Sequence, residues 1–95
     1  MQTKLLSEQQ VTGEGGEIIM LSYELLTEEL RDAEGKLICE LYGARITRRV
    51  GECVEEHSIR NITALGNEIL RIVDELARHT VFPVHMEDCV QELLL

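Results

Sequence analysis

The spacing of apolar residues predicts two long strands after the first 17 residues. From Ile18 onward the chain has apolar residues set among β-compatible neighbours, namely Ile18, Met20, Tyr23, Leu25 and Leu26, and Asp32-Ala-Glu-Gly35 supplies a turn in which glycine adopts positive φ easily. We therefore expect a first strand from residue 18 and a hairpin loop at residues 32–35. The alternative is a helix over residues 24–34, because Glu, Leu and Arg are good helix formers.

The predicted second strand, residues 36–50, has an unusual distribution of apolar side chains. One face holds Ile38, Tyr42, Ala44, Ile46 and Val50. The opposite face is apolar at its start, with Leu37, Cys39 and Leu41, and polar at its end. This pattern predicts a strand that is covered on both faces early and exposed on one face later, with Gly43 at a bulge or a close contact.

The last part of the chain predicts an edge strand and two helices. Residues 53–61 are mostly polar, as an edge strand would be, and Thr63 is a suitable N-cap for a helix over residues 64–80. Pro83 must end that helix, and a second helix is expected at residues 85–94. The expected core stripe of the first helix is Leu65, Ile69, Ile72, Val73 and Leu76, and that of the second is Met86, Cys89, Val90, Leu93 and Leu94.

These elements predict an α+β fold, a three-stranded antiparallel β-meander followed by two C-terminal α-helices packed on one face. Residues 1–17 are polar and contain three glycines, so we predict a flexible acidic N-terminal arm there, with a short helical turn at residues 5–10 as the alternative. Residues 18–95 then form a single small α+β domain. A domain of this size has a thin core, which favours covering by a second copy or a partner.

The charge balance argues against nucleic acid as a ligand. The chain has 18 acidic and 9 basic residues, a net charge of -9, whereas binding to phosphate backbones relies on Lys and Arg. We interpret the acidic surface as a solvated face, and the alternative is a binding surface for a basic partner.

The cysteine count and the hydropathy indicate a cytoplasmic protein. Cys39, Cys53 and Cys89 are odd in number and irregularly spaced, so a reducing compartment fits best. The first ten residues lack the apolar region of a secretion signal, and no apolar run is long enough to span a membrane.

Three segments carry a resemblance to a known group of proteins. They are Tyr42-Gly-Ala-Arg45 on a strand, Ile59-Arg-Asn-Ile-Thr63 before a helix, and Phe82-Pro-Val-His-Met-Glu-Asp-Cys-Val-Gln-Glu-Leu93 at the end. Together they resemble a family of small uncharacterised proteins, a domain of unknown function, from clostridial Gram-positive bacteria. The chain departs from that family at Asn61, where an acidic residue is usual, and at Cys89, where an aliphatic one is usual. The resemblance implies a bacterial cytoplasmic protein, supplies no mechanism, and makes His85 and Asp88 the most characteristic polar pair.

No motif of a catalytic site surrounds the titratable residues, so we predict neither an enzyme nor a cofactor. His85 fits a local structural role at the entry to the second helix. The spacing of Cys53 and His57 matches that of His85 and Cys89, and the four could complete a zinc site if strand and helix met. The favoured interpretation is no metal site, with Cys89 a small buried hydrophobe.

The candidate partner-binding residues lie in three places. Arg45, Arg48 and Arg49 form the one concentrated positive cluster, which we expect to pair with Glu52, Glu55 and Glu56 across the turn or with an acidic partner. Leu93, Leu94 and Leu95 are hard to bury in a small domain, and His85 with Asp88 completes the set.

The sequence therefore predicts a non-catalytic protein-interaction or regulatory module with a protein partner, a homodimer among the options. The alternative is a small-molecule- or metal-binding domain with a pocket between sheet and helices, lined by His and Arg.

Overall fold

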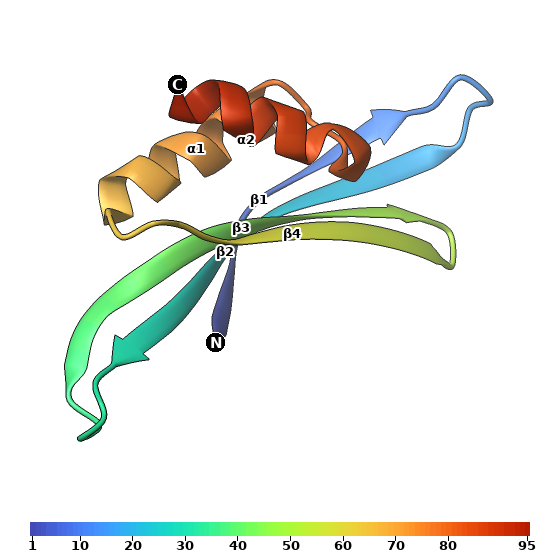
Figure 1. The fold of residues 1–95 in the computed structure, drawn as a ribbon. Coiled ribbons are helices and arrows are strands. Elements are labelled where there is room, and N and C mark those ends of the chain that lie inside the picture. The colour runs from blue at the N-terminus through green and yellow to red at the C-terminus, as the bar shows by residue number, and fades with distance from the viewer.

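A computed structural model describes all 95 residues and shows a four-stranded antiparallel sheet with two helices on one face (Figure 1). The strands lie in the order β1-β2-β3-β4. Their bounds are β1 Gln2–Thr12, β2 Ile18–Arg31, β3 Leu37–Val50 and β4 Cys53–Thr63, followed by α1 Gly66–Arg78, a 3₁₀ turn η1 Pro83–His85 and α2 Met86–Leu94. The predicted α+β class and the two C-terminal helices are confirmed.

The prediction of three strands is wrong, because residues 2–12 form a fourth. β1 pairs with β2 along its whole length, from Gln2 opposite Thr27 to Thr12 opposite Ile18. The Gln9 side-chain amide donates a hydrogen bond to the carbonyl of Ala77 on α1, at 2.6 Å. Residues 2–12 contain few apolar residues, so their extended conformation depends on hydrogen bonds to the edge of β2 and on the contact with α1. The mobility predicted for residues 1–17 stays a prediction.

The core lies between the sheet and the helices and is aliphatic apart from Tyr23. The alternative of a helix at residues 24–34 is wrong, since β2 continues to Arg31. The buried cluster is Ile19, Leu21, Tyr23, Ala44, Ile46, Ile69, Ile72, Val73, Leu76, Val81, Met86 and Val90. The Tyr23 hydroxyl donates to the Val81 carbonyl at 3.0 Å, and burial raises the pKa of Tyr23 to about 12. This bond ties the centre of the sheet to the segment between the helices.

The start of α1 differs from the prediction. The helix begins at Gly66, and the Thr63 hydroxyl accepts the backbone N–H of Leu65 at 3.1 Å, so Thr63 does not cap the helix. Leu65 keeps an extended backbone and is 62% exposed, so its predicted place in the core is wrong. The cause is that the chain leaves β4 extended and turns into the helix only after Leu65.

The change of direction predicted at Pro83 is confirmed, with α2 beginning one residue later than expected. Met86 and Val90 of α2 are buried, and Cys89 and Leu93 are partly buried against the core. Leu94 is exposed, so the predicted stripe of α2 is narrower than expected.

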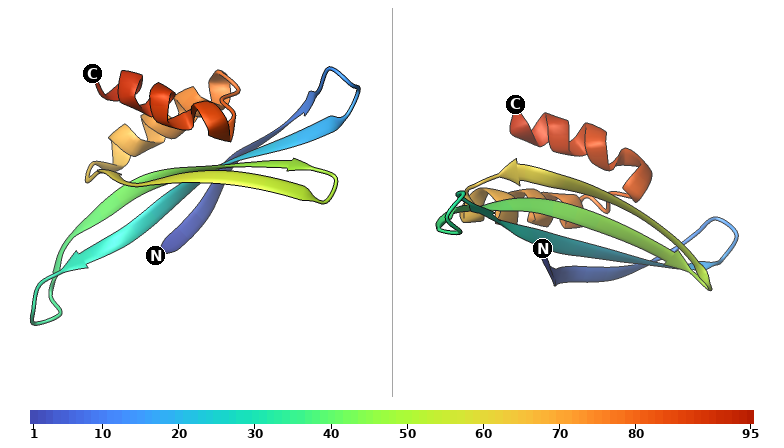
Figure 2. Two further views of the ribbon diagram at one scale, coloured as in Figure 1. Left: turned by 45° about the vertical axis from the view of Figure 1, so that its right-hand side comes forward. Right: turned by 60° about the horizontal axis from the view of Figure 1, so that its bottom comes forward.

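The sheet extends beyond the helices at both ends (Figure 2). β1 begins beside Thr27, and β4 ends beside Tyr42, so the β2–β3 hairpin continues past them as two strands. We call residues 28–41 the ribbon. The ribbon helps to make the molecule long and thin, at 54 × 30 × 17 Å.

Gly43 lies where β4 leaves the sheet, next to the root of the ribbon. A Cβ there would lie 2.3 Å from the Ile59 carbonyl oxygen, and the β3–β4 register shifts between Tyr42 and Ala44. Asn61 has a φ of 56°, which asparagine tolerates better than most residues. The predicted bulge or close contact at Gly43 is confirmed.

Candidate functional site

The apolar side of the sheet changes from one face to the other along β2 and β3. We call the part of the sheet that the helices cover the body. There, Leu21, Tyr23 and Ile46 point toward the helices and are fully buried. Side chains alternate along a strand and cross-strand partners share a face, so Leu26 and Leu30 of β2 point away from the helices. Cys39, the partner of Leu30, points the same way.

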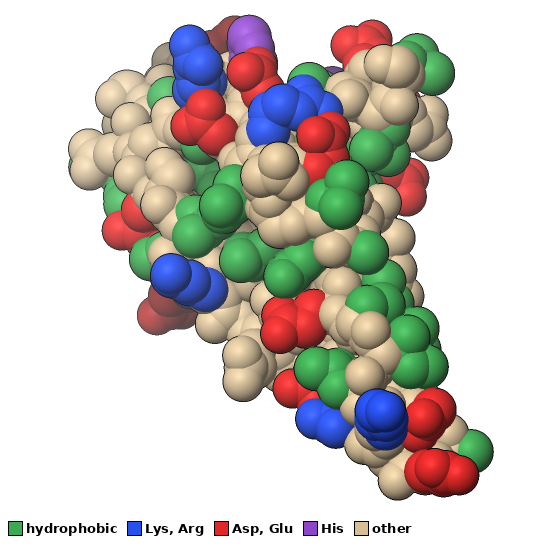
Figure 3. Space-filling model, turned by 90° about the vertical axis from the view of Figure 1, so that its left-hand side faces the viewer, with side chains coloured by type: hydrophobic (Ala, Val, Ile, Leu, Met, Phe, Trp, Pro, Cys, Tyr) green, Lys and Arg blue, Asp and Glu red, His purple; other side chains and the backbone are tan.

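These residues form one patch on the face that no element of the chain covers. The apolar patch consists of Leu5, Leu26, Leu30, Cys39 and Leu41. Leu5 is 54% exposed and Leu30 is 43% exposed, Cys39 and Leu41 are partly exposed, and Leu26 is buried. Figure 3 shows hydrophobic side chains along the tapering lower part of the molecule, which ends in charged side chains at the hairpin turn.

Two ion pairs lie among the residues of the apolar patch, because Glu28 stands between Leu26 and Leu30 on β2 and Glu24 is the cross-strand partner of Leu5. Arg60 makes two hydrogen bonds of 2.6 Å with the Glu28 carboxylate. Those bonds lower the pKa of Glu28 and raise the pKa of Arg60. Arg45 donates to Glu24 at 2.6 Å, which raises the pKa of Arg45. The charged groups within the patch therefore already neutralise one another.

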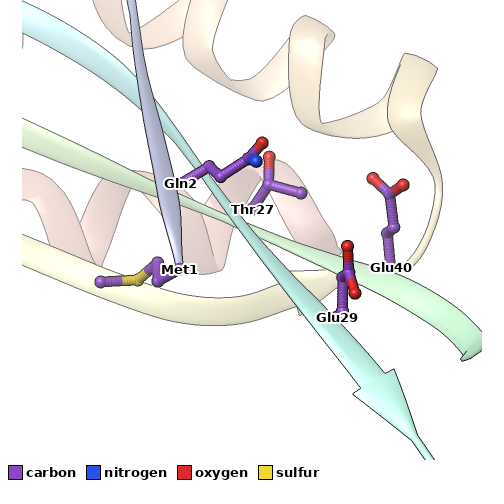
Figure 4. Close-up of a pocket in the computed structure, with 5 residues that line it drawn as sticks. All are labelled: Met1, Gln2, Thr27, Glu29 and Glu40. Atoms are coloured by element: carbon purple, nitrogen blue, oxygen red, sulfur yellow. The ribbon is translucent and has the colours of Figure 1, made fainter. Parts of the chain in front are cut away.

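The opposite side of the ribbon is polar and acidic. Glu29 and Glu40 are cross-strand partners, and Figure 4 shows their side chains on the same side of the sheet as Gln2 and Thr27. The Arg31 guanidinium pairs with Glu29, and the Tyr42 hydroxyl donates to Glu40 at 3.2 Å. A depression of about 290 Å³ lies here, and Met1 is its one hydrophobic lining residue. The ribbon is therefore amphipathic, with its apolar side facing away from the helices.

The predicted arginine cluster does not make the expected pairs. Arg45 pairs with Glu24 on β2 instead of with Glu52, Glu55 or Glu56. Arg48 lies over the Phe82 ring, 6.0 Å from its centroid, although its register partner is Glu55. Arg49 makes no ion pair. The three arginines are divided between the two faces because their positions alternate along β3.

The predicted C-terminal candidates are close in sequence but make few contacts. His85 and Asp88 are both exposed, and no hydrogen bond joins them. Leu93 is partly buried, and Leu94 and Leu95 are exposed. Their role in binding stays a prediction.

The four residues of the zinc alternative do not come together. No group of three His, Cys, Asp or Glu side chains is placed to hold a metal ion. Cys53 is exposed at the β3–β4 turn, and Cys89 is partly buried on α2. His57 lies 3.7 Å from Glu87 of α2.

Two grooves come closest to the predicted pocket. One lies between α1 and β1, has a volume of about 310 Å³ and is lined by Leu6, Ser7, Leu70, Val73, Asp74 and Ala77, without His or Arg. The other lies between the two helices. It has a volume of about 360 Å³, and its lining includes Leu76, His79, Cys89 and Leu93 but no arginine. Burial, helped by Glu92 and Asp88, raises the pKa of the Cys89 thiol. A thiol held in its protonated form is a poor nucleophile.

The fold and the site together define a small α+β domain, with a four-stranded meander, two helices on one face and an apolar ribbon patch on the other. No helix has the length and hydrophobicity needed to cross a membrane.

The chain belongs to a family of unknown function, DUF6514, whose model matches residues 2–95. This finding supports the uncharacterised family that the sequence resembles, and the clostridial source stays a prediction. No curated protein and no solved structure matches the chain.

The sequence placed Leu37, Cys39 and Leu41 at the start of one face of β3 and predicted that this start is covered on both faces. That prediction is wrong, because Leu37 is 46% exposed, Ile38 is 60% exposed, and Cys39 and Leu41 are only partly buried. The residues of β2 that share the patch were not predicted. The sequence does contain a signal for them. Leu26 and Leu30 occupy even-numbered positions of β2, like Glu24 and Glu28, and so lie on the opposite face from Leu21 and Tyr23.

Proposed function

We propose that this chain is a non-catalytic protein-interaction or regulatory module that binds another polypeptide through the apolar patch of the ribbon. The observation that carries the proposal is the exposed apolar side chain of Leu30, next to Cys39, on a face with no covering element. A two-stranded hairpin without a packed face is at best marginally stable in water. A partner that covers the patch would supply the missing layer.

The charge distribution supports the same proposal. Glu28 and Glu24 within the patch are both engaged by arginines, so covering the patch leaves neither carboxylate without a partner. The other carboxylates of the ribbon, Glu29 and Glu40 on its opposite side and Asp32 and Glu34 at its turn, stay in solvent when a partner covers the patch.

The groove between the helices is the weaker candidate for a binding site. It offers apolar walls, but His79 is already engaged by Glu75 at 3.1 Å and Cys89 has a raised pKa. A ligand site normally adds a few convergent polar groups to such walls. The alternative of a small-molecule-binding domain therefore has less support than the interaction module.

Site-specific photo-crosslinking tests the proposal. A photoreactive amino acid replaces Leu30 in the patch or, as a control, Leu70 of α1, which lies on the helix side of the sheet beside Leu6 and Ser7 and is 50% exposed. In living cells that make the chain at its natural level, we expect a discrete adduct with a second polypeptide from position 30 and none from position 70. Equal labelling at both positions, or no adduct at position 30, would contradict the proposal.

A further inference from the structure

We infer that the polypeptide that covers the apolar patch is a second copy of this chain, with two ribbons packed face to face across a two-fold axis. The inference rests on the proposed function, because it names the occupant of the same patch. It commits to a symmetric dimer in which Leu30 and Cys39 of one copy lie against the same residues of the other.

The surface area of the single chain agrees with a missing partner. The accessible surface is 6248 Å² for a chain of 10.8 kDa. A compact monomer of that mass would expose about 5,500 Å², so the excess is about 700 Å². A standard interface buries about 800 Å² on each partner. The excess surface of one chain is therefore close to what one side of a dimer interface removes.

The radius of gyration leads to the same conclusion. It is 14.8 Å, whereas about 12 Å is expected for a compact domain of this length. The ribbon contributes to this excess because it projects past the helices without packing on them (Figures 1 and 2).

The chemistry of the patch fits a copy of itself better than a charged peptide. The patch is made of aliphatic side chains and one thiol, and the two carboxylates among them, Glu24 and Glu28, are held by Arg45 and Arg60. Within the patch, a basic or acidic peptide would find no charge that is not already paired, since the unpaired Arg49 and Glu56 lie farther along the same face. An identical apolar patch is complementary by symmetry, and neither copy buries an unpaired charge.

The net charge predicts how such a dimer responds to salt. Each copy carries a net charge of -9, so the two copies repel at long range while the apolar contact attracts them. Added salt screens the repulsion and leaves the apolar contact in place. Dimerisation should therefore be equal or tighter at high salt, opposite to an association between the acidic surface and arginines.

Sedimentation velocity of the full chain over a range of concentrations and salt tests the inference. We expect a monomer–dimer equilibrium whose dissociation constant stays equal or falls as salt rises. Leu30→Glu places an unpaired charge in the interface and should raise that constant about tenfold or more. Leu70→Glu adds the same charge on α1, at 50% exposure, and should leave it unchanged.

Cross-linking gives a second measurement that does not depend on a destabilising variant. In a variant with Cys53→Ser and Cys89→Ser, a short bismaleimide should join two chains through Cys39. The variant that keeps only Cys53, the more exposed thiol, should cross-link far less.

Three outcomes would overturn the inference: a monomer at every concentration, a dimer unaffected by Leu30→Glu, or a dimer that salt weakens. The first of these, combined with a photo-adduct to a different protein at position 30, would leave the proposed function standing. A monomer with no adduct at position 30 would remove both.

Discussion

The two ends of the β2–β3 hairpin differ in the side of the sheet on which they place their apolar residues. In the body, Leu21, Tyr23 and Ile46 face α1 and α2 and are completely buried. In the ribbon, Leu30 and Cys39 face the other way, and no part of the chain covers them. The same pair of strands therefore has one end whose apolar face is buried within the chain and another whose apolar face is open.

The largest expected difference between the two ends comes from replacing one leucine at each end by alanine. Leu21→Ala should lower the free energy of unfolding by about 2–5 kcal/mol, because it leaves a cavity in the core. Leu30→Ala should lower it by about 1 kcal/mol or less, because the side chain is 43% exposed. Urea denaturation, at a concentration where the chain is monomeric, measures both. Equal losses would show that the ribbon is already packed within one chain.

Alkaline pH separates the two ends through their tyrosines. Tyr23 in the body has a pKa of about 12, above the ordinary value of 10.0. Its stabilising contribution is complete below pH 10 and is lost as pH rises through 12, by about 2–3 kcal/mol in total. The advantage of the wild type over Tyr23→Phe in free energy of unfolding should therefore shrink across this range.

Tyr42, at the root of the ribbon, is the matched control. Its pKa is also raised, by burial and by the bond to Glu40, but its side chain is only partly buried. Urea titrations of Tyr42→Phe at the same pH values should show a smaller change. An equal change with pH in the two variants would show that Tyr42 is as strongly buried at the root of the ribbon as Tyr23 is in the body.

The border between the two ends is tested at Gly43. Gly43→Ala forces a Cβ against the Ile59 carbonyl oxygen and should cost about 1–3 kcal/mol in the free energy of unfolding. Gly66→Ala is the control, because its Cβ would meet only the Tyr42 side chain, at 3.8 Å. That change should be neutral or stabilise the protein by up to about 1 kcal/mol, because alanine favours helix. Thermal and urea unfolding of the two variants decide whether β4 must approach β3 this closely.

The smallest expected effect concerns the charges on the uncovered face. Glu24→Gln weakens the pair with Arg45 and the hydrogen bond from Thr47, and should cost about 0.5–1 kcal/mol. Glu55→Gln, at an exposed position without an ion pair, should change the free energy of unfolding by less than about 0.5 kcal/mol. A cost for Glu24→Gln no larger than that for Glu55→Gln would show that the pair adds nothing to this face.

The elements with strong periodicity were predictable, and those decided by pairing were not. The stripe from Ile69 to Leu76 and the bend at Pro83 follow from local rules, and both are confirmed. β1 was missed because its few apolar residues, such as Leu6 and Val11, set no clear alternation. Its conformation depends on hydrogen bonds from β2 and on the contact of Gln9 with α1.

The arginine cluster shows the same limit at the level of side chains. Its residues are close in sequence, but neighbouring positions on a strand point to opposite faces. Arg45 reaches Glu24 on β2, whereas Arg48 lies over Phe82 beyond the end of α1. Neither Glu24 nor Phe82 is a sequence neighbour, so only the register of three strands and the path of the helices could identify them.

The sequence by itself determined the α+β class, the helical stripe, the proline bend and the apolar start of the second face on β3. Each of these depends on residue type and on spacings of two, three or four, which act locally. Three features were decided only by the tertiary structure. β1 adds a fourth strand to the sheet, neither helix covers the ribbon, and Leu30 and Cys39 lie together on the face of the ribbon that points away from the helices. Those features depend on which strand edges and faces meet, and such contacts join residues far apart in the chain.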